Sequence, residues 1–147
     1  MPGGVGRVRA GSPPDGAARD TAGATPDTAR ATRDTTGAGP DAGALARDAE
    51  DLVRRLRRWT AASWTLPPQG PGPATRADAA HLAVQRIADL GADAELRLRL
   101  PVPRLADPVL ADQLAVVVDD VVRTGDPTAV RGTAAVLRAL RLVLALR

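Results

Sequence analysis

The sequence predicts an all-α fold, a small bundle of about four helices that ends in an antiparallel helical hairpin. Apolar residues recur at every third or fourth position over four stretches, and Asp-Pro pairs open two of these stretches. The first forty residues contain no Leu, Ile or aromatic residue, so they offer little apolar area to bury. We therefore expect a disordered, low-complexity leader over residues 1–40 and one helical domain over residues 41–147.

The composition excludes several kinds of chemistry. The chain has twenty Arg but no Lys, and it also lacks Cys, Tyr and Phe. A disulfide framework, a thiolate site and a catalytic Lys or Tyr are therefore excluded. Seventeen acidic residues reduce the net charge to +3, which disfavours a strongly basic nucleic-acid binder. No apolar run reaches the length of a membrane span and no signal-peptide core is visible, so we expect a cytoplasmic protein without membrane contact.

The first helix is predicted to begin near Asp41 and to end near Trp64. Its charges form the favourable i,i+4 pairs Glu50–Arg54 and Asp51–Arg55. Residues 65–73 hold four Pro and two Gly, so we expect an extended linker over 65–74. The apolar stripe of this helix comprises Leu45, Ala49, Leu52, Val53, Leu56 and Trp59.

The second helix is predicted to begin at a capping box of Thr75 and Asp78 and to stop at Gly91. Residues 95–103 are ambiguous because their leucines alternate with Arg and Pro, which is a strand pattern without a partner strand. A helix would instead form two i,i+4 ion pairs, Asp93–Arg97 and Glu95–Arg99. We favour an extended segment over 95–105 that lies on the helices.

Two further helices are each predicted to begin with an Asp N-cap followed by Pro, at Asp107 and at Asp126. The third helix runs over 108–124 and ends at Gly125, and the fourth runs over 127–146. The link between them is short, so the two helices fold back antiparallel. Ion pairs are expected across this hairpin between Asp112, Asp119 and Asp120 on one arm and Arg131, Arg138, Arg141 and Arg147 on the other.

The hairpin carries more apolar residues than one buried stripe for each helix requires. Either the segment at 95–103 covers this surplus or another chain does, and we expect a homodimer or an obligate protein partner. The candidate interface residues are Trp64, Val116, Val122, Val136, Leu142 and Leu146. For Trp64, packing within the chain, against Pro67 or Pro68, is favoured over partner contact.

Two candidate sites have simpler explanations. Arg54, Arg55 and Arg58 are candidate nucleic-acid contacts, although a solvated, internally paired helix face is favoured. His81 with Asp78 could act as a general base, but no nucleophile lies near it in sequence. We therefore expect no enzyme, no metal and no cofactor. The favoured function is protein–protein interaction, and the alternative is a small DNA-binding regulator that uses the Arg cluster.

Four stretches also carry a family resemblance. They are Thr75-Arg76-Ala77-Asp78-Ala79-Ala80-His81-Leu82, Val84-Gln85-Arg86-Ile87-Ala88-Asp89-Leu90, Pro101-Val102-Pro103-Arg104-Leu105 and Leu110-Ala111-Asp112-Gln113-Leu114-Ala115-Val116-Val117. Together they resemble the CATRA-associated small proteins, which are encoded beside components of predicted bacterial conflict systems. The resemblance spans residues 45–147. It implies an accessory or interaction protein of a multi-component system, with no catalytic residues to carry over.

Overall fold

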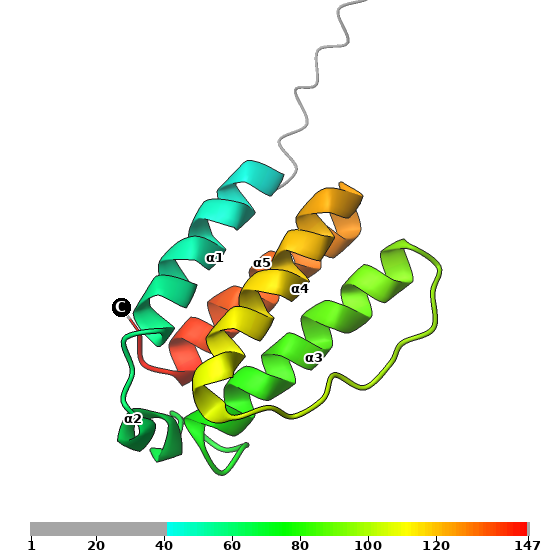
Figure 1. Cartoon of the computed structure of the whole chain (residues 1–147). Coiled ribbons are helices and arrows are strands. Elements are labelled where there is room, and N and C mark those ends of the chain that lie inside the picture. Colours follow the sequence, from blue (N-terminus) through cyan, green and yellow to red (C-terminus); the bar gives the residue numbers. More distant parts are fainter. Residues whose placement is uncertain (1–40, 147) are drawn as a thin grey trace, which may run out of the picture. The chain divides into compact units, whose positions relative to one another are not determined.

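The computed structural model describes residues 41–146, which form five α-helices, a short 3-10 helix and no strand (Figure 1). The elements are α1 (Ala42–Leu56), α2 (Ala61–Thr65), α3 (Arg76–Ala94), η1 (Asp107–Val109), α4 (Leu110–Thr124) and α5 (Pro127–Val143). The all-α fold class is therefore confirmed, with four long helices and one short helix. The expectation of a disordered leader concerns residues outside the described part of the chain.

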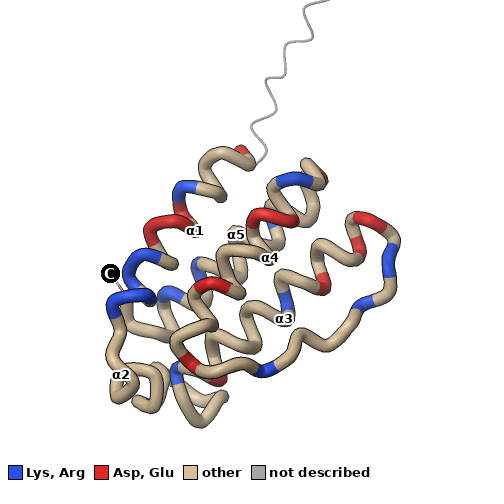
Figure 2. The backbone as a smooth tube through the Cα atoms, in the orientation of Figure 1, with Lys and Arg blue, Asp and Glu red and all other residues tan. Residues whose placement is uncertain are grey.

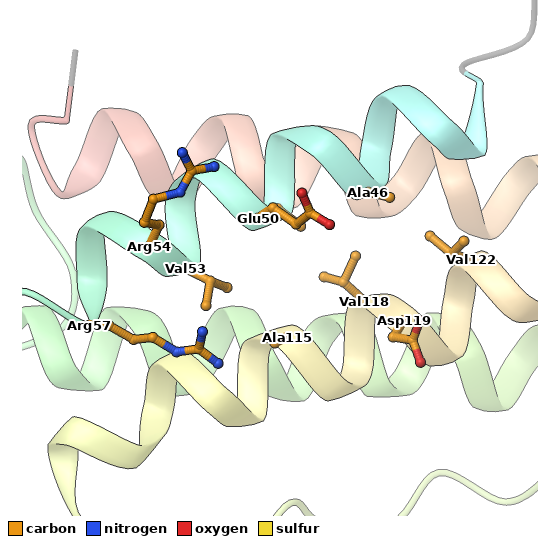
Figure 3. Close-up of a pocket in the computed structure, with 10 residues that line it drawn as sticks. Ala46, Glu50, Val53, Arg54, Arg57, Ala115, Val118, Asp119 and Val122 are labelled. Carbon is orange, nitrogen blue, oxygen red and sulfur yellow. The ribbon is translucent and has the colours of Figure 1, made fainter.

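The four long helices form a bundle of two layers. Viewed onto α1 and α4, α5 lies behind α1 and α3 lies behind α4 (Figure 3). In accord with this arrangement, α4 packs mainly on α3 and α1, whereas α5 packs mainly on α3. The predicted antiparallel hairpin of α4 and α5 is present, but its two arms occupy a diagonal of the bundle and contact each other little.

The helices α3 and α4 run in the same direction, although they follow one another in the chain (Figure 1). The chain must therefore return along α3 before α4 can begin. A helix of 19 residues is about 28 Å long at about 1.5 Å per residue. An extended chain covers this distance in about nine residues, whereas a further helix would need about twice as many. Residues 95–106 are the return segment: Glu95 and Leu96 form the turn that ends α3, and residues 97–106 are accordingly extended.

The helix α1 ends at Leu56, so the prediction of one helix to Trp64 is wrong. Thr60 has an extended backbone and its hydroxyl accepts a hydrogen bond from the Ser63 N–H at 3.3 Å, which caps a separate helix, α2. This break redirects the chain, and Trp64 enters the core.

The Trp64 side chain is 0% exposed. Its ring packs edge-on against Trp59 at a centroid distance of 4.9 Å, and the Arg76 guanidinium lies 5.3 Å from the centre of the Trp59 ring. Trp64 is therefore a core residue of this end of the bundle and not a residue of a partner interface.

The segment 66–75 is free of helix, as its prolines predict, but it is not an extended linker. The Arg76 N–H donates to the Leu66 carbonyl and the Gln69 N–H donates to the Val143 carbonyl, both at 2.8 Å. These bonds close the segment into a loop that is tied to the end of α5. The loop connects two helices of the same bundle.

The helix α3 continues through Gly91 to Ala94, three residues beyond the predicted end. Gly91 is buried where α3 meets α4, and a Cβ atom placed there would lie 3.5 Å from a methyl carbon of Val121. Gly91 thus belongs to the helix packing. The stop comes at Leu96, whose positive φ of 53° permits the closing bond from the Arg97 N–H to the Ala92 carbonyl. The helix α5 also ends earlier than predicted, at Val143.

The predicted caps differ in outcome. Thr75 and Asp78 form the expected capping box at the start of α3, and Asp126 accepts the Ala129 N–H at 2.7 Å at the start of α5. Asp107 does not cap α4, because it lies inside η1 and its carboxylate accepts a hydrogen bond from Arg104 instead.

The expected ion pairs across the hairpin are not formed by the residues that the structure describes, and Arg147 lies outside them. Charged residues lie along every long helix, and α5 carries basic residues alone (Figure 2), but the charged side chains of α4 and α5 find their ion-pair partners elsewhere. Arg123 pairs with two acids of its own helix. Asp112 pairs with Arg57 at 2.7 Å, and Arg141 reaches Asp51 of α1 at 3.4 Å. The diagonal placement of α4 and α5 makes α1 the nearer source of partners.

Candidate functional site

The return segment carries three strongly exposed leucines, two of which are the most exposed large apolar residues among those described. Leu96, Leu98 and Leu100, the leucine row, are 95%, 85% and 69% exposed. The segment runs along α3 as predicted (Figure 1), and Val102 packs partly against the core. Of the two alternatives for the apolar surplus of the hairpin, cover by the leucines of this segment is excluded, because these leucines face solvent.

Polar side chains hold the beginning of the return segment. Arg99 makes two hydrogen bonds to the carboxylate of Asp93 at the end of α3, at 2.8 and 2.6 Å, and Arg97 pairs with Glu95. The hydrogen bond from Arg99 holds the pKa of Asp93 below its usual value, and the pKa of Arg99 is raised in turn. The arginines of the alternating pattern are thus engaged within the chain.

The middle of the segment is attached by two glutamines. The Gln85 amide nitrogen donates to the Leu100 carbonyl at 3.1 Å, and its amide oxygen accepts the Val102 N–H at 2.7 Å. Gln113 of α4 donates to the Pro103 carbonyl at 3.0 Å. These bonds replace the ladder that a partner strand would supply.

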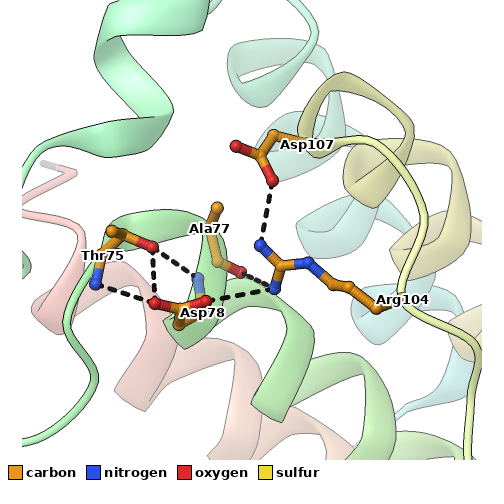
Figure 4. A network of polar contacts seen from close by, with 5 residues as sticks. All are labelled: Thr75, Ala77, Asp78, Arg104 and Asp107. Atoms are coloured by element: carbon orange, nitrogen blue, oxygen red, sulfur yellow. Dashed lines mark hydrogen bonds and ion pairs between the residues drawn. The ribbon is translucent and has the colours of Figure 1, made fainter.

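Arg104 attaches the last part of the segment to the beginnings of α3 and η1 (Figure 4). Its guanidinium donates to the Ala77 carbonyl at 3.2 Å and to the Asp107 carboxylate at 2.9 Å, and it lies 3.4 Å from Asp78. Asp78 also accepts the Thr75 N–H and hydroxyl in the capping box. One carboxylate therefore serves both the start of the helix and the anchor of the segment.

The backbone between these anchors is open. Within residues 41–146, the N–H and C=O groups of Leu98 and Arg99 form no hydrogen bond. The segment thus offers solvent both apolar side chains and free backbone groups, while side-chain anchors at its beginning, middle and end hold it in place.

A second feature is a groove of about 470 Å³ between α1 and α4 (Figure 3). Its floor is formed by small apolar side chains such as Ala49 and Val118, and charged side chains including Glu50 and Arg57 stand at its rim. Val122, one of the predicted interface residues, lines this groove.

A smaller groove of about 250 Å³ lies between α3 and α5, in the other layer of the bundle, and Val136 lines it. Val116 and Leu142 are exposed singly, and Leu146 is partly buried against the core. The predicted interface residues are therefore spread over both layers of the bundle instead of forming one surface. The diagonal relation of α4 and α5 is the reason.

The Arg cluster is partly neutralised. Arg55 pairs with Asp51 at 3.1 Å as predicted, and the neighbouring Arg57 pairs with Asp112. No ion pair joins Glu50 to Arg54 in the described part of the chain, although both line the α1/α4 groove. Arg54 and Arg58 are exposed.

The possible catalytic pair is not assembled. No hydrogen bond joins Asp78 to His81 in the structure, and the buried Nδ1 atom of His81 has no partner among the described residues. No group of three or more His, Asp or Glu side chains between residues 41 and 146 is arranged to hold a metal ion. In the same range, no helix is both long enough and apolar enough to cross a membrane.

Comparison of the chain with protein-family models, with curated proteins and with solved structures finds no match. The function must therefore be argued from the residues themselves. The sequence alone did not predict that the leucines at 96–100 face solvent. Asp93 and Glu95, which come just before them, could have indicated it, because they form ion pairs with Arg99 and Arg97 and so hold these arginines beside the end of α3.

Proposed function

We propose that the chain is a non-enzymatic interaction protein that binds another protein chain through the leucine row. The observation that carries this proposal is an ordered segment whose leucines face solvent while its polar side chains are engaged within the chain. Scattered exposed apolar residues are ordinary, but three exposed leucines within five residues of one anchored segment mark a contact surface.

The energetics favour such a contact. Burying one exposed leucine contributes roughly 1.5–3 kcal/mol, so three leucines offer several kcal/mol before the cost of association. Because Gln85, Arg99 and Arg104 already hold the segment, little backbone entropy is lost when a partner binds. A flexible loop of the same composition would bind more weakly, because it would lose more conformational entropy on binding.

The resemblance to the CATRA-associated small proteins supports the same class of function. Under this proposal the chain serves as an accessory component of a multi-component bacterial conflict system and contributes contacts instead of chemistry.

Site-specific photo-cross-linking in the source cells tests the proposal. A photoreactive residue at position 98 is expected to give a discrete adduct with a protein chain. Position 142 is a matched control, because Leu142 is also exposed, at 72%, but lies apart from the return segment. Equal adduct formation at both positions, or none at position 98, would contradict the proposal.

The DNA-binding alternative depends on Arg54, Arg55 and Arg58. Arg54 and Arg58 form no ion pair within residues 41–146, which favours it, whereas the pairs at Arg55 and Arg57 weaken it. A gel shift with duplex DNA that persists at roughly 200 mM salt and is lost when all three are changed to Ala would support this alternative. We expect at most weak association that disappears as salt rises.

A further inference from the structure

The leucine row reads the same in both directions, because residues 96–100 are Leu-Arg-Leu-Arg-Leu. Two such rows placed antiparallel about a twofold axis at Leu98 set Leu98 against its own copy and Leu96 against Leu100. We propose that the partner of the leucine row is a second copy of this chain, bound antiparallel through the same row. This inference rests on the proposed function and names its partner.

The charges around the row fit a second copy. Asp93 and Glu95 balance Arg97 and Arg99, and all four are paired within the chain, Asp93 with Arg99 and Glu95 with Arg97. Two copies therefore meet without unpaired like charges. A partner recruited by charge would need unpaired charges beside the leucines, and these four residues supply none.

The backbone also fits an antiparallel pair of short strands. The N–H and C=O groups of Leu98 are free among the described residues and point to the same edge of the extended chain, so two copies can exchange two N–H···O=C bonds at Leu98. The backbone groups of Arg99 point to the opposite edge and take no part. The Leu96 N–H already donates to the Asp93 carbonyl and the Leu100 carbonyl already accepts from Gln85, so the backbone pairing is limited to Leu98. An open strand edge with a leucine face is also the kind of surface that aggregates unless something covers it.

The interface is small. Three leucines on each side bury far less than the roughly 800 Å² for each partner of a standard interface, so the dimer is weak and reversible. It forms at high protein concentration, or when another component of an assembly raises the local concentration.

Single-cysteine variants test this pairing, because the chain has no cysteine of its own. Under mild oxidation, Leu98→Cys is expected to form a disulfide-linked dimer, since its two copies meet at the twofold axis. Leu142→Cys, also exposed but away from the row, serves as the control and is expected to give several-fold less cross-linking.

A mixture of Leu96→Cys and Leu100→Cys chains tests the direction of pairing. An antiparallel pair gives more mixed dimer than dimer of either variant alone, whereas a parallel pair gives the reverse and overturns the proposed geometry. In sedimentation experiments, Leu98→Asp is expected to weaken dimerisation about tenfold or more while its circular dichroism and thermal unfolding stay those of the original chain.

Two outcomes overturn the second copy as partner. One is cross-linking at position 98 no greater than at position 142, and the other is a chain that sediments as a monomer at every concentration. If position 98 still cross-links to a different protein in cells, the proposed function stands and only the identity of the partner is wrong. If neither contact is found, both proposals fail together.

Discussion

Leucines have opposite fates in two neighbouring regions of this molecule. In the bundle, leucines such as Leu110 and Leu114 are almost fully buried between helices, and their removal from water drives the packing. In the return segment, Leu98 and its neighbours face solvent, while Gln85, Arg99 and Arg104 hold the backbone in place. Order in a protein thus does not require burial of the apolar side chains that lie in the ordered segment.

The same substitution made in both regions tests most directly whether buried and exposed leucines contribute differently to stability. Leu114→Ala is expected to lower the free energy of unfolding by roughly 2–5 kcal/mol, because it leaves a cavity in the core. Leu98→Ala is expected to change it by less than about 0.5 kcal/mol. Thermal unfolding measures both, and in a domain of roughly 100 residues each kcal/mol shifts Tm by about 4–8 °C. Equal effects would show that the leucine row is part of the core.

Removal of an anchor tests the other half of the comparison. Gln85→Ala is expected to lower stability by about 1–2 kcal/mol and to speed hydrogen exchange at the Val102 amide about tenfold, because this amide loses its acceptor. Asp89→Ala is the control, since it removes a different bond of Gln85 and keeps both bonds to the segment. Unchanged exchange at Val102 in the Gln85 variant would mean that the side-chain anchors do not hold the segment.

Backbone strain at Leu96, where α3 meets the return segment, is expected to have a smaller effect on stability than the two changes above. Leu96 has a φ of 53°, a conformation that glycine adopts freely and leucine does not, and its side chain has no packing to lose. Leu96→Gly is therefore expected to raise stability by up to about 1 kcal/mol in chemical denaturation. A clear loss of stability would indicate that Leu96 makes a contact that its exposure does not suggest. Gly125→Ala, at a φ of 66°, is expected to act in the opposite sense.

The smallest expected effect concerns the acid that anchors the start of the segment. The hydrogen bond from Arg99 lowers the pKa of Asp93, so this pair contributes stability at neutral pH and loses it as the pH falls through the pKa of the folded state. In an NMR titration, Asp93 is expected to titrate below its ordinary value. Arg99→Gln is expected to move this titration upward, and an unmoved titration would contradict the pairing.

Local patterns predicted the helices well. The Thr75–Asp78 capping box, the Asp126 cap and the Gly125 stop are all present, because each depends on hydrogen bonds or backbone angles within a few residues. Local patterns failed where a distant element intervened. Gly91 has the chemistry of a helix stop, yet the approach of Val121 from α4 makes it part of the helix interior.

The sequence by itself determined an all-α bundle, its approximate helices and the extended form of residues 97–105, whereas the first two residues of the predicted segment, 95 and 96, form a turn. Only the tertiary structure decided that α3 and α4 run parallel, that α4 and α5 lie diagonally and that the leucine row faces solvent. The physical reason is that periodicity fixes which residues share a face but not what that face meets. For residues 96–100, the acids at the end of α3 and the amide of Gln85 hold the segment against α3 and leave the leucines in water.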